Sequence, residues 1–179
     1  MTESIIVAGS GGQGIMLLGK IIAEAALLQG KFVTWLPAYG PEVRGGAAHC
    51  MIIIADDEIG SPFIDQADTL IVMNQLSLVK FKSRLKDNGL IVINSSLAKL
   101  DNRVKFKAAA GACTDIAADL GNIKVANVVA LGMYLASKKI ISEENTEKVI
   151  KKMAPEDKPG LLKINLEALK KGMELIKNG

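Results

Sequence analysis

The stretch SIIVAGSGGQGIMLLGKIIAEAALLQGKFVTWL, residues 4–36, decides the fold. Its first five residues form a short apolar run that ends in glycines, which predicts a buried strand. The apolar segment 15–28 is long enough for a buried helix, and the β-branched and aromatic segment 31–36 predicts a second strand that stops at Pro37. Strand, glycine-rich turn, helix and strand in this order are typical of a βαβ unit.

Three further runs, residues 48–55, 69–73 and 90–94, are apolar throughout and predict buried strands. Residues 75–85 set apolar side chains opposite basic ones, which predicts an amphipathic helix. Strands that are apolar throughout, instead of alternating, are covered on both faces and are typical of parallel sheets. The sequence therefore predicts an α/β fold: a three-layer, Rossmann-like, mostly parallel sheet with helices on both faces.

The second half of the chain is mainly helical by pattern. An edge strand is expected at 104–108, and helices are expected at 114–120, 125–138, 143–153 and 161–177. Ser142 is expected to cap the third of these helices, and Pro159 to begin the last. The only linker-like stretch, PEDKPG, is followed by too few residues for a second domain. We expect one domain, residues 1–179, with C-terminal helices docked on it.

Composition excludes several classes of protein. The 179 residues are 49% hydrophobic and 23% charged, which is typical of a folded domain. The net charge of +3 combines an acidic first part, with three basic and eight acidic residues up to position 79, and a basic remainder with nineteen against eleven. Nucleic-acid binders usually set aromatic residues among their bases, but the basic part holds only three aromatics. We therefore expect solvated helix faces and no nucleic-acid partner.

Cysteine spacing and hydropathy point to a reduced, cytoplasmic protein. Cys50 and Cys113 stand far apart and form no C-x-x-C pair, so a disulfide scaffold, a metal site or a cluster held by this chain alone is not expected. The N-terminus shows no basic region or cleavage site of a signal peptide. No apolar run reaches the ~18 residues that a membrane span needs, so no membrane is expected as a partner.

The glycine-rich turn is the sharpest local motif. It satisfies G-x-G-x-x-G between a predicted strand and a predicted helix, where glycines let a phosphate approach the helix N-terminus. The second strand offers no acidic residue for a ribose, and the turn lacks the P-loop lysine, so NAD, FAD and Walker-type binding are disfavoured. The alternative is a tight turn with close packing only. Candidate phosphate-facing residues are Gly9, Gly11, Gly12, Gln13 and Gly14.

A second loop, YGPEVRGG at residues 39–46, follows the second strand at the end where parallel sheets bind ligands. Arg44 could hold a phosphate or carboxylate with two hydrogen bonds, and its neighbouring glycines permit a close approach. The alternative is a structural contact between Glu42 and Arg44. The candidate residues of this loop are Tyr39, Arg44, Gly45 and Gly46. Phe32, Trp35 and Tyr39 concentrate aromatic side chains beside it and predict a contact surface for a partner.

No self-sufficient catalytic set is visible in the sequence. His49 and Cys50 are adjacent on a predicted strand, so their side chains point to opposite faces and cannot act as a nucleophile and its base. We expect structural roles for both. No G-x-S-x-G, H-E-x-x-H or paired-carboxylate motif appears, and no residue is predicted to be catalytic.

The motifs GSGGQG, YGPEVRGG and GSPFIDQAD before TLIVMNQ, with their spacing, resemble the gamma subunit of 2-oxoacid:ferredoxin oxidoreductases, the 2-oxoglutarate, ketoisovalerate and pyruvate synthase family. The likeness extends from about Ile5 to the helices near the C-terminus. The short chain is most similar to the gamma subunit of a separate-subunit 2-oxoglutarate or branched-chain enzyme.

The resemblance implies a role in a larger enzyme that oxidatively decarboxylates a 2-oxoacid to an acyl-CoA. It implies thiamine diphosphate, coenzyme A and iron-sulfur clusters in the assembled complex, with alpha, beta and ferredoxin-like delta subunits as partners and ferredoxin as electron acceptor. The thiamine and cluster sites would lie on those other subunits, so the isolated chain is expected to be inactive. In the isolated chain, the surface that would contact those subunits is uncovered, which favours a homodimer.

Three hypotheses about function remain open at this point. In the first, residues 11–14 and 39–46 face the coenzyme A side of the active site, with Arg44 as the charged contact. In the second, the chain is a scaffold in which Arg44 and Trp35 anchor a subunit interface. In the third, it is a free-standing nucleotide-binding protein.

Overall fold

The computed structural model describes residues 1–39, 47–101, 106–155 and 157–177. Arg44, Gly45 and Gly46 therefore lie outside the described residues, and Tyr39 is described in its backbone only. The strands are β1 (Thr2–Ser10), β2 (Phe32–Tyr39), β3 (Ala47–Ala55), β4 (Ala67–Val72), β5 (Leu85–Asn94) and β6 (Lys107–Gly111). The helices are α1 (Ile15–Leu27), α2 (Gln75–Phe81), α3 (Cys113–Asp119), α4 (Ala126–Ser137), α5 (Glu143–Met153) and α6 (Pro159–Lys177), with the short 3-10 helices η1 (Lys82–Arg84) and η2 (Ile123–Val125).

The six strands form one mixed sheet in the order β2-β3-β1-β4-β5-β6. β1, β4, β5 and β6 are parallel neighbours, which confirms the mostly parallel α/β fold. The expectation that residues 48–55 join a parallel sheet is wrong, because β3 lies between β1 and β2 and runs antiparallel to both. The connection at residues 40–46 is too short for the crossover that a parallel neighbour of β2 would need. β2 thus runs in the direction of β1 without touching it.

Several strand boundaries differ from the prediction, and β5 begins at Leu85, five residues earlier than expected. β2 continues through Pro37 to Tyr39, although Pro37 was expected to stop it. β2 is an edge strand, and an edge strand tolerates a residue without a backbone N–H. The last strand, β6, begins three residues later than expected and pairs with β5.

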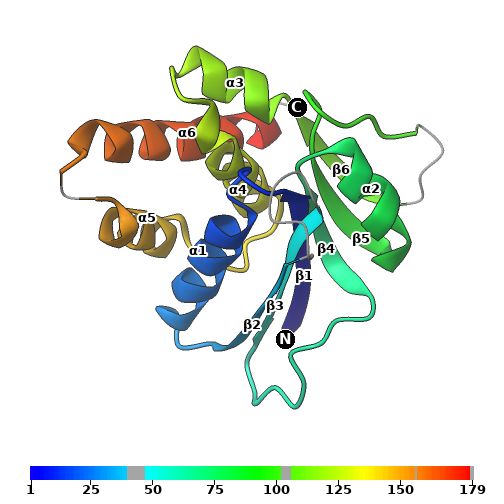
Figure 1. The fold of residues 1–179 in the computed structure, drawn as a ribbon. Coiled ribbons are helices and arrows are strands. Elements are labelled where there is room, and N and C mark those ends of the chain that lie inside the picture. Colours follow the sequence, from blue (N-terminus) through cyan, green and yellow to red (C-terminus); the bar gives the residue numbers. More distant parts are fainter. Residues whose placement is uncertain (40–46, 102–105, 156, 178–179) are drawn as a thin grey trace.

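Helices cover both faces of the sheet, which confirms the three-layer arrangement. α1, α4, α5 and α6 lie on one face and α2 on the other (Figure 1). Because neighbouring residues of a strand point to opposite faces, Ile5 and Val7 of β1 join the core under α1 and α4, whereas Ile6 and Ala8 join the core under α2. All four side chains are fully buried.

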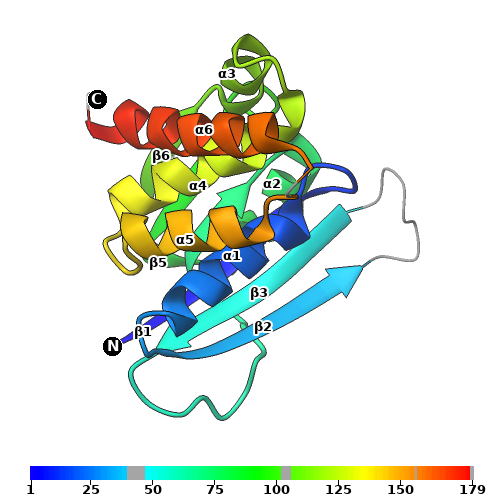
Figure 2. The same ribbon diagram turned by 90° about the vertical axis from the view of Figure 1, so that its left-hand side faces the viewer.

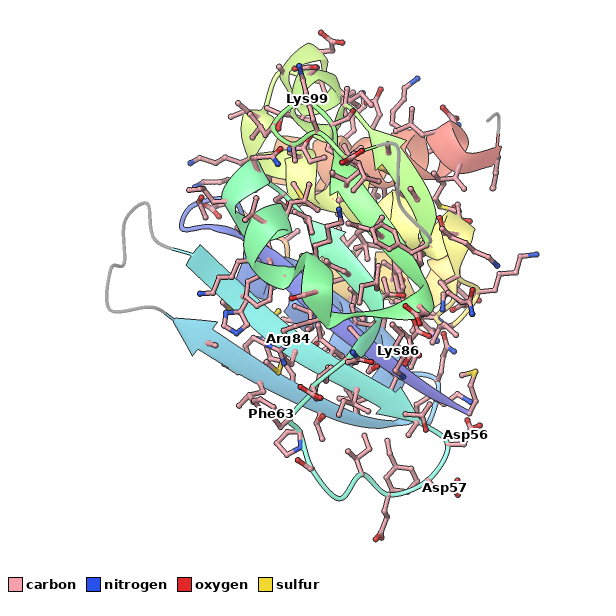
Figure 3. The ribbon with its side chains drawn as sticks, turned by 90° about the vertical axis from the view of Figure 1, so that its right-hand side faces the viewer. Asp56, Asp57, Phe63, Arg84, Lys86 and Lys99 are labelled. Atoms are coloured by element: carbon pink, nitrogen blue, oxygen red, sulfur yellow. The ribbon has the colours of Figure 1, made fainter. Side chains whose placement is uncertain are left out.

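On the face that carries α2, the connection between β3 and β4 also packs against the sheet layer. Figure 3 shows Arg84 beside Phe63, and the guanidinium carbon lies 5.6 Å from the centre of the phenyl ring. Arg84 also donates hydrogen bonds to the carbonyl oxygens of Ile64 and of Asp65, the latter at 3.0 Å. Residues 63–65 are therefore held against the end of the α2 layer.

α4 and α6 cross with their backbones in contact. A Cβ atom on Gly132 would collide with the carbonyl oxygen of Leu169, and one on Gly172 would collide with the carbonyl oxygen of Val129. A side chain at either glycine would push the helices apart. The predicted docking of the C-terminal helices is confirmed, and it depends on these two glycines.

The predicted helix ends are also confirmed. Ser142 caps α5, since its Oγ accepts a hydrogen bond from the Asn145 N–H at 3.1 Å. Pro159 is the first residue of α6, where its missing N–H costs no hydrogen bond. Within the described ranges, no helix is long and apolar enough to cross a membrane.

Candidate site at the carboxyl end of the sheet

The glycine-rich turn joins the carboxyl end of β1 to the start of α1, and its glycines serve different purposes. Gly12 and Gly14 adopt φ angles of +91° and +70°, which other residues rarely adopt. A Cβ on Gly14 would collide with the side-chain amide of Asn127, and one on Gly9 would lie 2.5 Å from the Ile15 Cδ1. A Cβ on Gly12 would meet nothing within 4 Å. Close packing thus explains Gly9 and Gly14, whereas Gly12 faces open space.

The side chain of Gln13 fastens this turn to the neighbouring strand β4. Its Oε1 accepts hydrogen bonds from the Ser10 N–H at 2.7 Å and from the Asn74 Nδ2 at 3.1 Å. Its Nε2 donates to the carbonyl oxygen of Met73 at 3.1 Å. Asn74 also caps α2 by accepting from the Ser77 N–H at 2.9 Å. Gln13 is therefore committed to bracing the turn.

Two more amide side chains continue this arrangement along the sheet and across to α4. Asn94, at the end of β5, donates to the carbonyl oxygen of Met73 at 3.2 Å and to the Thr114 Oγ1 at 2.8 Å. Asn127, on the first turn of α4, donates to the carbonyl oxygen of Gly14 at 3.1 Å. We call Gln13, Asn74, Asn94 and Asn127 the amide network. It holds the strand ends with neutral groups.

A cavity of about 170 Å³ opens beside the amide network. Its lining includes Gly12, Gln13 and Met73, together with Thr114 and Lys124. Lys124 supplies a positive charge at this cavity. The first N–H groups of α1, which have no partner within the helix, also lie at this end of the sheet and favour an anion.

The second predicted loop begins at the same end of the sheet. Gly9 of β1 pairs with Ala48 of β3, and Ala48 pairs in turn with Tyr39 of β2, so one strand separates the end of β2 from the glycine-rich turn. The structure thus brings the start of the loop and the turn to one edge. Whether Arg44, Gly45 and Gly46 face that edge stays a prediction.

The predicted aromatic contact surface is divided between the two faces of β2. Trp35 lies on the α1 face, where its indole stands over Gly19 and beside Cys50. Phe32 is three residues away along the strand and therefore lies on the opposite face. Both side chains are exposed, Phe32 to 46% and Trp35 to 36%. A partner at this edge strand would meet one aromatic on each face.

His49 and Cys50 point to opposite faces, as predicted. His49 stacks on Phe81 of α2 with ring centres 4.7 Å apart, whereas Cys50 is buried in the core under α1. Burial, with the charges of Lys80 and Arg84, lowers the pKa of His49. Burial raises the pKa of the Cys50 thiol to about 12. Neither is placed to act as a nucleophile with a base.

The sequence interpretation missed most of the amide network. Asn74 and Asn94 had a visible pattern, because each stands at the end of an apolar strand run, where parallel strands present ligand-binding groups. Asn127 and Lys124 had no such pattern in the sequence, since they lie near the turn only because α4 packs on α1. In the part of the chain that the structure describes, no group of three or more His, Cys, Asp or Glu residues could hold a metal ion.

Comparison with known proteins places the chain in a family. Residues 4–175 match the family model described as pyruvate ferredoxin/flavodoxin oxidoreductase. The ketoisovalerate oxidoreductase subunit VorA of Methanothermobacter thermautotrophicus is 34% identical over 168 residues, which cover 94% of this chain. The chain spans only about a third of that relative, 35% of its length.

Other relatives match along their whole length. The 2-oxoglutarate synthase subunit KorC of Methanocaldococcus jannaschii is 33% identical over 181 residues, covering 99% of this chain and 95% of the relative. The keto/oxoacid ferredoxin oxidoreductase gamma subunit of Geobacter sulfurreducens superposes with a TM-score of 0.85 at 32% identity, covering 99% of both chains. These matches confirm the resemblance seen in GSGGQG and YGPEVRGG. The chain belongs to the pyruvate ferredoxin/flavodoxin oxidoreductase family.

Proposed function

We propose that this chain is the gamma subunit of a multi-subunit 2-oxoacid:ferredoxin oxidoreductase, which oxidatively decarboxylates a 2-oxoacid to an acyl-CoA. Matches over nearly the whole chain to the KorC subunit and to the Geobacter gamma subunit support this role. We propose 2-oxoglutarate as the substrate, because the KorC relative is matched over 95% of its length and the VorA relative over 35%.

The partners we propose are the alpha, beta and ferredoxin-like delta subunits, with ferredoxin as electron acceptor in the cytoplasm. Thiamine diphosphate and the iron-sulfur clusters would be bound by those subunits. The two cysteines of this chain support that division, since both are buried in separate places and burial raises the pKa of each thiol to about 12. A ligand of a metal cluster must be a thiolate, which these surroundings disfavour.

We further propose that the carboxyl end of the sheet helps to complete the coenzyme A side of the active site. The observation that carries this proposal is Gly12, whose positive φ and open Cβ position leave its backbone accessible beside a cavity that Lys124 lines. A phosphate of coenzyme A fits such a place, because backbone N–H groups and a lysine both favour an anion. From the second loop, we propose Arg44, Gly45 and Gly46 as further contacts to that phosphate.

The test is Arg44→Ala in the assembled enzyme. We expect an apparent KM for coenzyme A that is raised about tenfold, as the loss of one charged contact to a phosphate predicts. Lys99→Ala, which removes an exposed lysine with no ion pair among the described residues, is the matched control and should leave the KM unchanged (Figure 3). An unchanged KM for Arg44→Ala in a fully assembled complex would contradict the proposed role.

A scaffold without ligand contacts is the alternative, and the exposed aromatics of β2 favour it. Phe32 and Trp35 stand on an edge strand whose outer side pairs with no other strand among the described residues. If they anchor a subunit interface, Phe32→Ser and Trp35→Ser would lower the yield of partner subunits that co-purify with the chain, without a change in the KM for coenzyme A. The two sets of variants therefore separate the two functions.

A further inference from the structure

Strand β2 forms one edge of the sheet, and its outer side pairs with no other strand among the described residues. Figure 2 shows β2 at the margin of the sheet, with β3 on its inner side. Such an edge presents backbone N–H and C=O groups that can pair with a further strand. Proteins usually protect an edge with charged side chains, a bulge or a very short strand.

The two edges of this sheet differ in that protection. β6, at the opposite edge, is five residues long and begins with the exposed Lys107. β2 is eight residues long, its pairing with β3 has no shift in register, and its sequence FVTWLPAY holds no charged residue. Phe32 and Trp35 are also 46% and 36% exposed. These features indicate an edge that a further strand covers.

Pro37 fixes which residues of β2 present their backbone groups outward. A proline fits an edge strand where its nitrogen points away from the sheet, so Pro37 belongs to the outward-facing residues. In an antiparallel pair, residues that bond the neighbouring strand alternate with residues that do not. Val33 and Trp35, four and two residues before Pro37, therefore direct their N–H and C=O groups outward. These groups are available to a second strand.

A second copy of β2 is complementary to this edge when it runs antiparallel. On the face that carries α2, the exposed Phe32 of one copy would lie beside the end of the other copy that carries the small Ala38. On the α1 face, the two Trp35 side chains would meet near the middle of both strands, and aromatic pairs across strands are favourable. No like charges would oppose each other, since Lys31, just before β2, already pairs with Asp56 at 2.6 Å.

We propose that β2 pairs antiparallel with β2 of a second copy of this chain, about a two-fold axis near Trp35. The outward N–H groups of Val33 and Trp35 donate to carbonyl oxygens of the other copy, and the two sheets become one continuous sheet. Because the axis uses the same surface of both copies, the dimer is closed and does not grow into a fibre. The pairing is independent of the proposed function and holds whether or not the carboxyl end of the sheet contacts coenzyme A.

The test is sedimentation velocity of the full 179-residue chain over a range of concentrations. We expect a dimer that dissociates on dilution. Trp35→Lys and Trp35→Glu should each weaken this dimer at least tenfold, because each places two like charges near the axis. Mixed in equal amounts, the two variants should form a heterodimer, since a lysine then faces a glutamate. A wild type that stays monomeric at every concentration would overturn the proposal, as would a mixture that does not associate.

Leu76→Lys is the matched control. Leu76 is 75% exposed and lies on α2, which packs over β1 and β4 and not over β2. Its replacement removes an exposed apolar side chain of the same surface type and should leave the dimer unchanged. If Leu76→Lys dissociates the dimer as strongly as Trp35→Lys does, the two copies meet at another surface and the proposal is wrong.

Amide hydrogen exchange of the wild type checks the pairing without any variant. Exchange at Val33 and Trp35 should slow as the concentration rises and the dimer forms. Thr34 is the internal reference, because its backbone groups bond β3 in the monomer as well, and its exchange should stay the same. Exchange at Val33 and Trp35 that does not change in a dimeric sample would contradict the proposal. An unchanged KM for coenzyme A in Arg44→Ala has no bearing on these results.

Discussion

The two ends of the sheet are held by different chemistry. At the amino end, three acidic side chains pair with cations: Glu3 pairs with Lys138 at 3.1 Å, Asp68 with Lys86 at 2.7 Å, and Asp56 with both Lys31 and the Met1 amine at 2.6 Å. Asp56 and Lys86 can be followed at this end in Figure 3. At the carboxyl end, the neutral side chains of the amide network hold the strand ends and the glycine-rich turn by hydrogen bonds.

The difference concerns which lysines are paired with an acidic side chain. Ion pairs satisfy the lysines of the amino end, whereas Lys124 and Lys158 have no acidic partner among the described residues. Neutral amides position a turn without neutralising a nearby cation. The proposed anion site at the carboxyl end therefore keeps the positive charge of Lys124.

The largest effect is expected at the amino end, from Lys138→Met. Glu3 is 4% exposed, and its carboxylate would keep only the Thr69 hydroxyl, at 2.6 Å, as a partner. We expect the free energy of unfolding in urea to fall by about 3 kcal/mol, because a buried carboxylate would lose its charged partner. Adding Glu3→Gln should restore most of that loss.

Lys148→Met is the matched control for this variant. Lys148 pairs with Glu144 on the exposed surface of α5, so its loss should cost less than about 0.5 kcal/mol. Equal effects of the two lysine variants would remove the distinction between the amino end and an ordinary surface.

A smaller loss is expected at the carboxyl end from Gln13→Ala. The Ser10 N–H and the Met73 carbonyl oxygen would each lose a hydrogen bond, which predicts about 2 kcal/mol in the same urea measurement. Gln75→Ala is the control, because its Oε1 accepts a single exposed hydrogen bond from the Lys99 N–H. If Gln13→Ala costs no more than Gln75→Ala, the amide network does not hold this end.

Gly12→Ala should cost about 1 kcal/mol, since the alanine must adopt a positive φ but meets no neighbour. Gly14→Ala should cost more, because it adds a collision with Asn127 to the same kind of strain. Thermal melting of both variants checks the order. The reverse order would mean that the turn is not held by Asn127 as described.

The smallest effect concerns pH and Asp56. Hydrogen bonds from Lys31 and the N-terminal amine lower the pKa of Asp56 to about 2. Because the folded pKa lies below the unfolded value of ~3.9, the stability it confers is complete above about pH 4 and is lost as pH falls through about 2. Melting temperatures of the wild type and Asp56→Asn should therefore converge between pH 5 and pH 2. Parallel curves would show that the pair adds nothing.

The sequence predicts the elements well because the apolar runs are long and clearly interrupted. The direction of β3 could not be read from them, since a central strand is apolar on both faces whether it runs parallel or antiparallel. The length of the connection at residues 40–46 was the better indicator, because so few residues favour a hairpin.

The candidate site was predictable in part. The glycine-rich turn lies where the motif placed it, at the start of α1. Its supporting residues come from the ends of β4 and β5 and from α4, so they depend on which strands are neighbours. The helical layer behind them depends further on how α6 lies against α4, which is fixed by the contact between Gly132 and Gly172. No local pattern contains that information.

The position of β3 has a consequence for the order of folding. β3 lies between β1 and β2 although it follows both in the chain, so β2 has no strand to pair with until β3 is in place. A nascent chain that ends before residue 47 would hold two apolar strands that do not pair with each other. The backbone amides of β2 should therefore become protected from hydrogen exchange only together with those of β3, as one cooperative step.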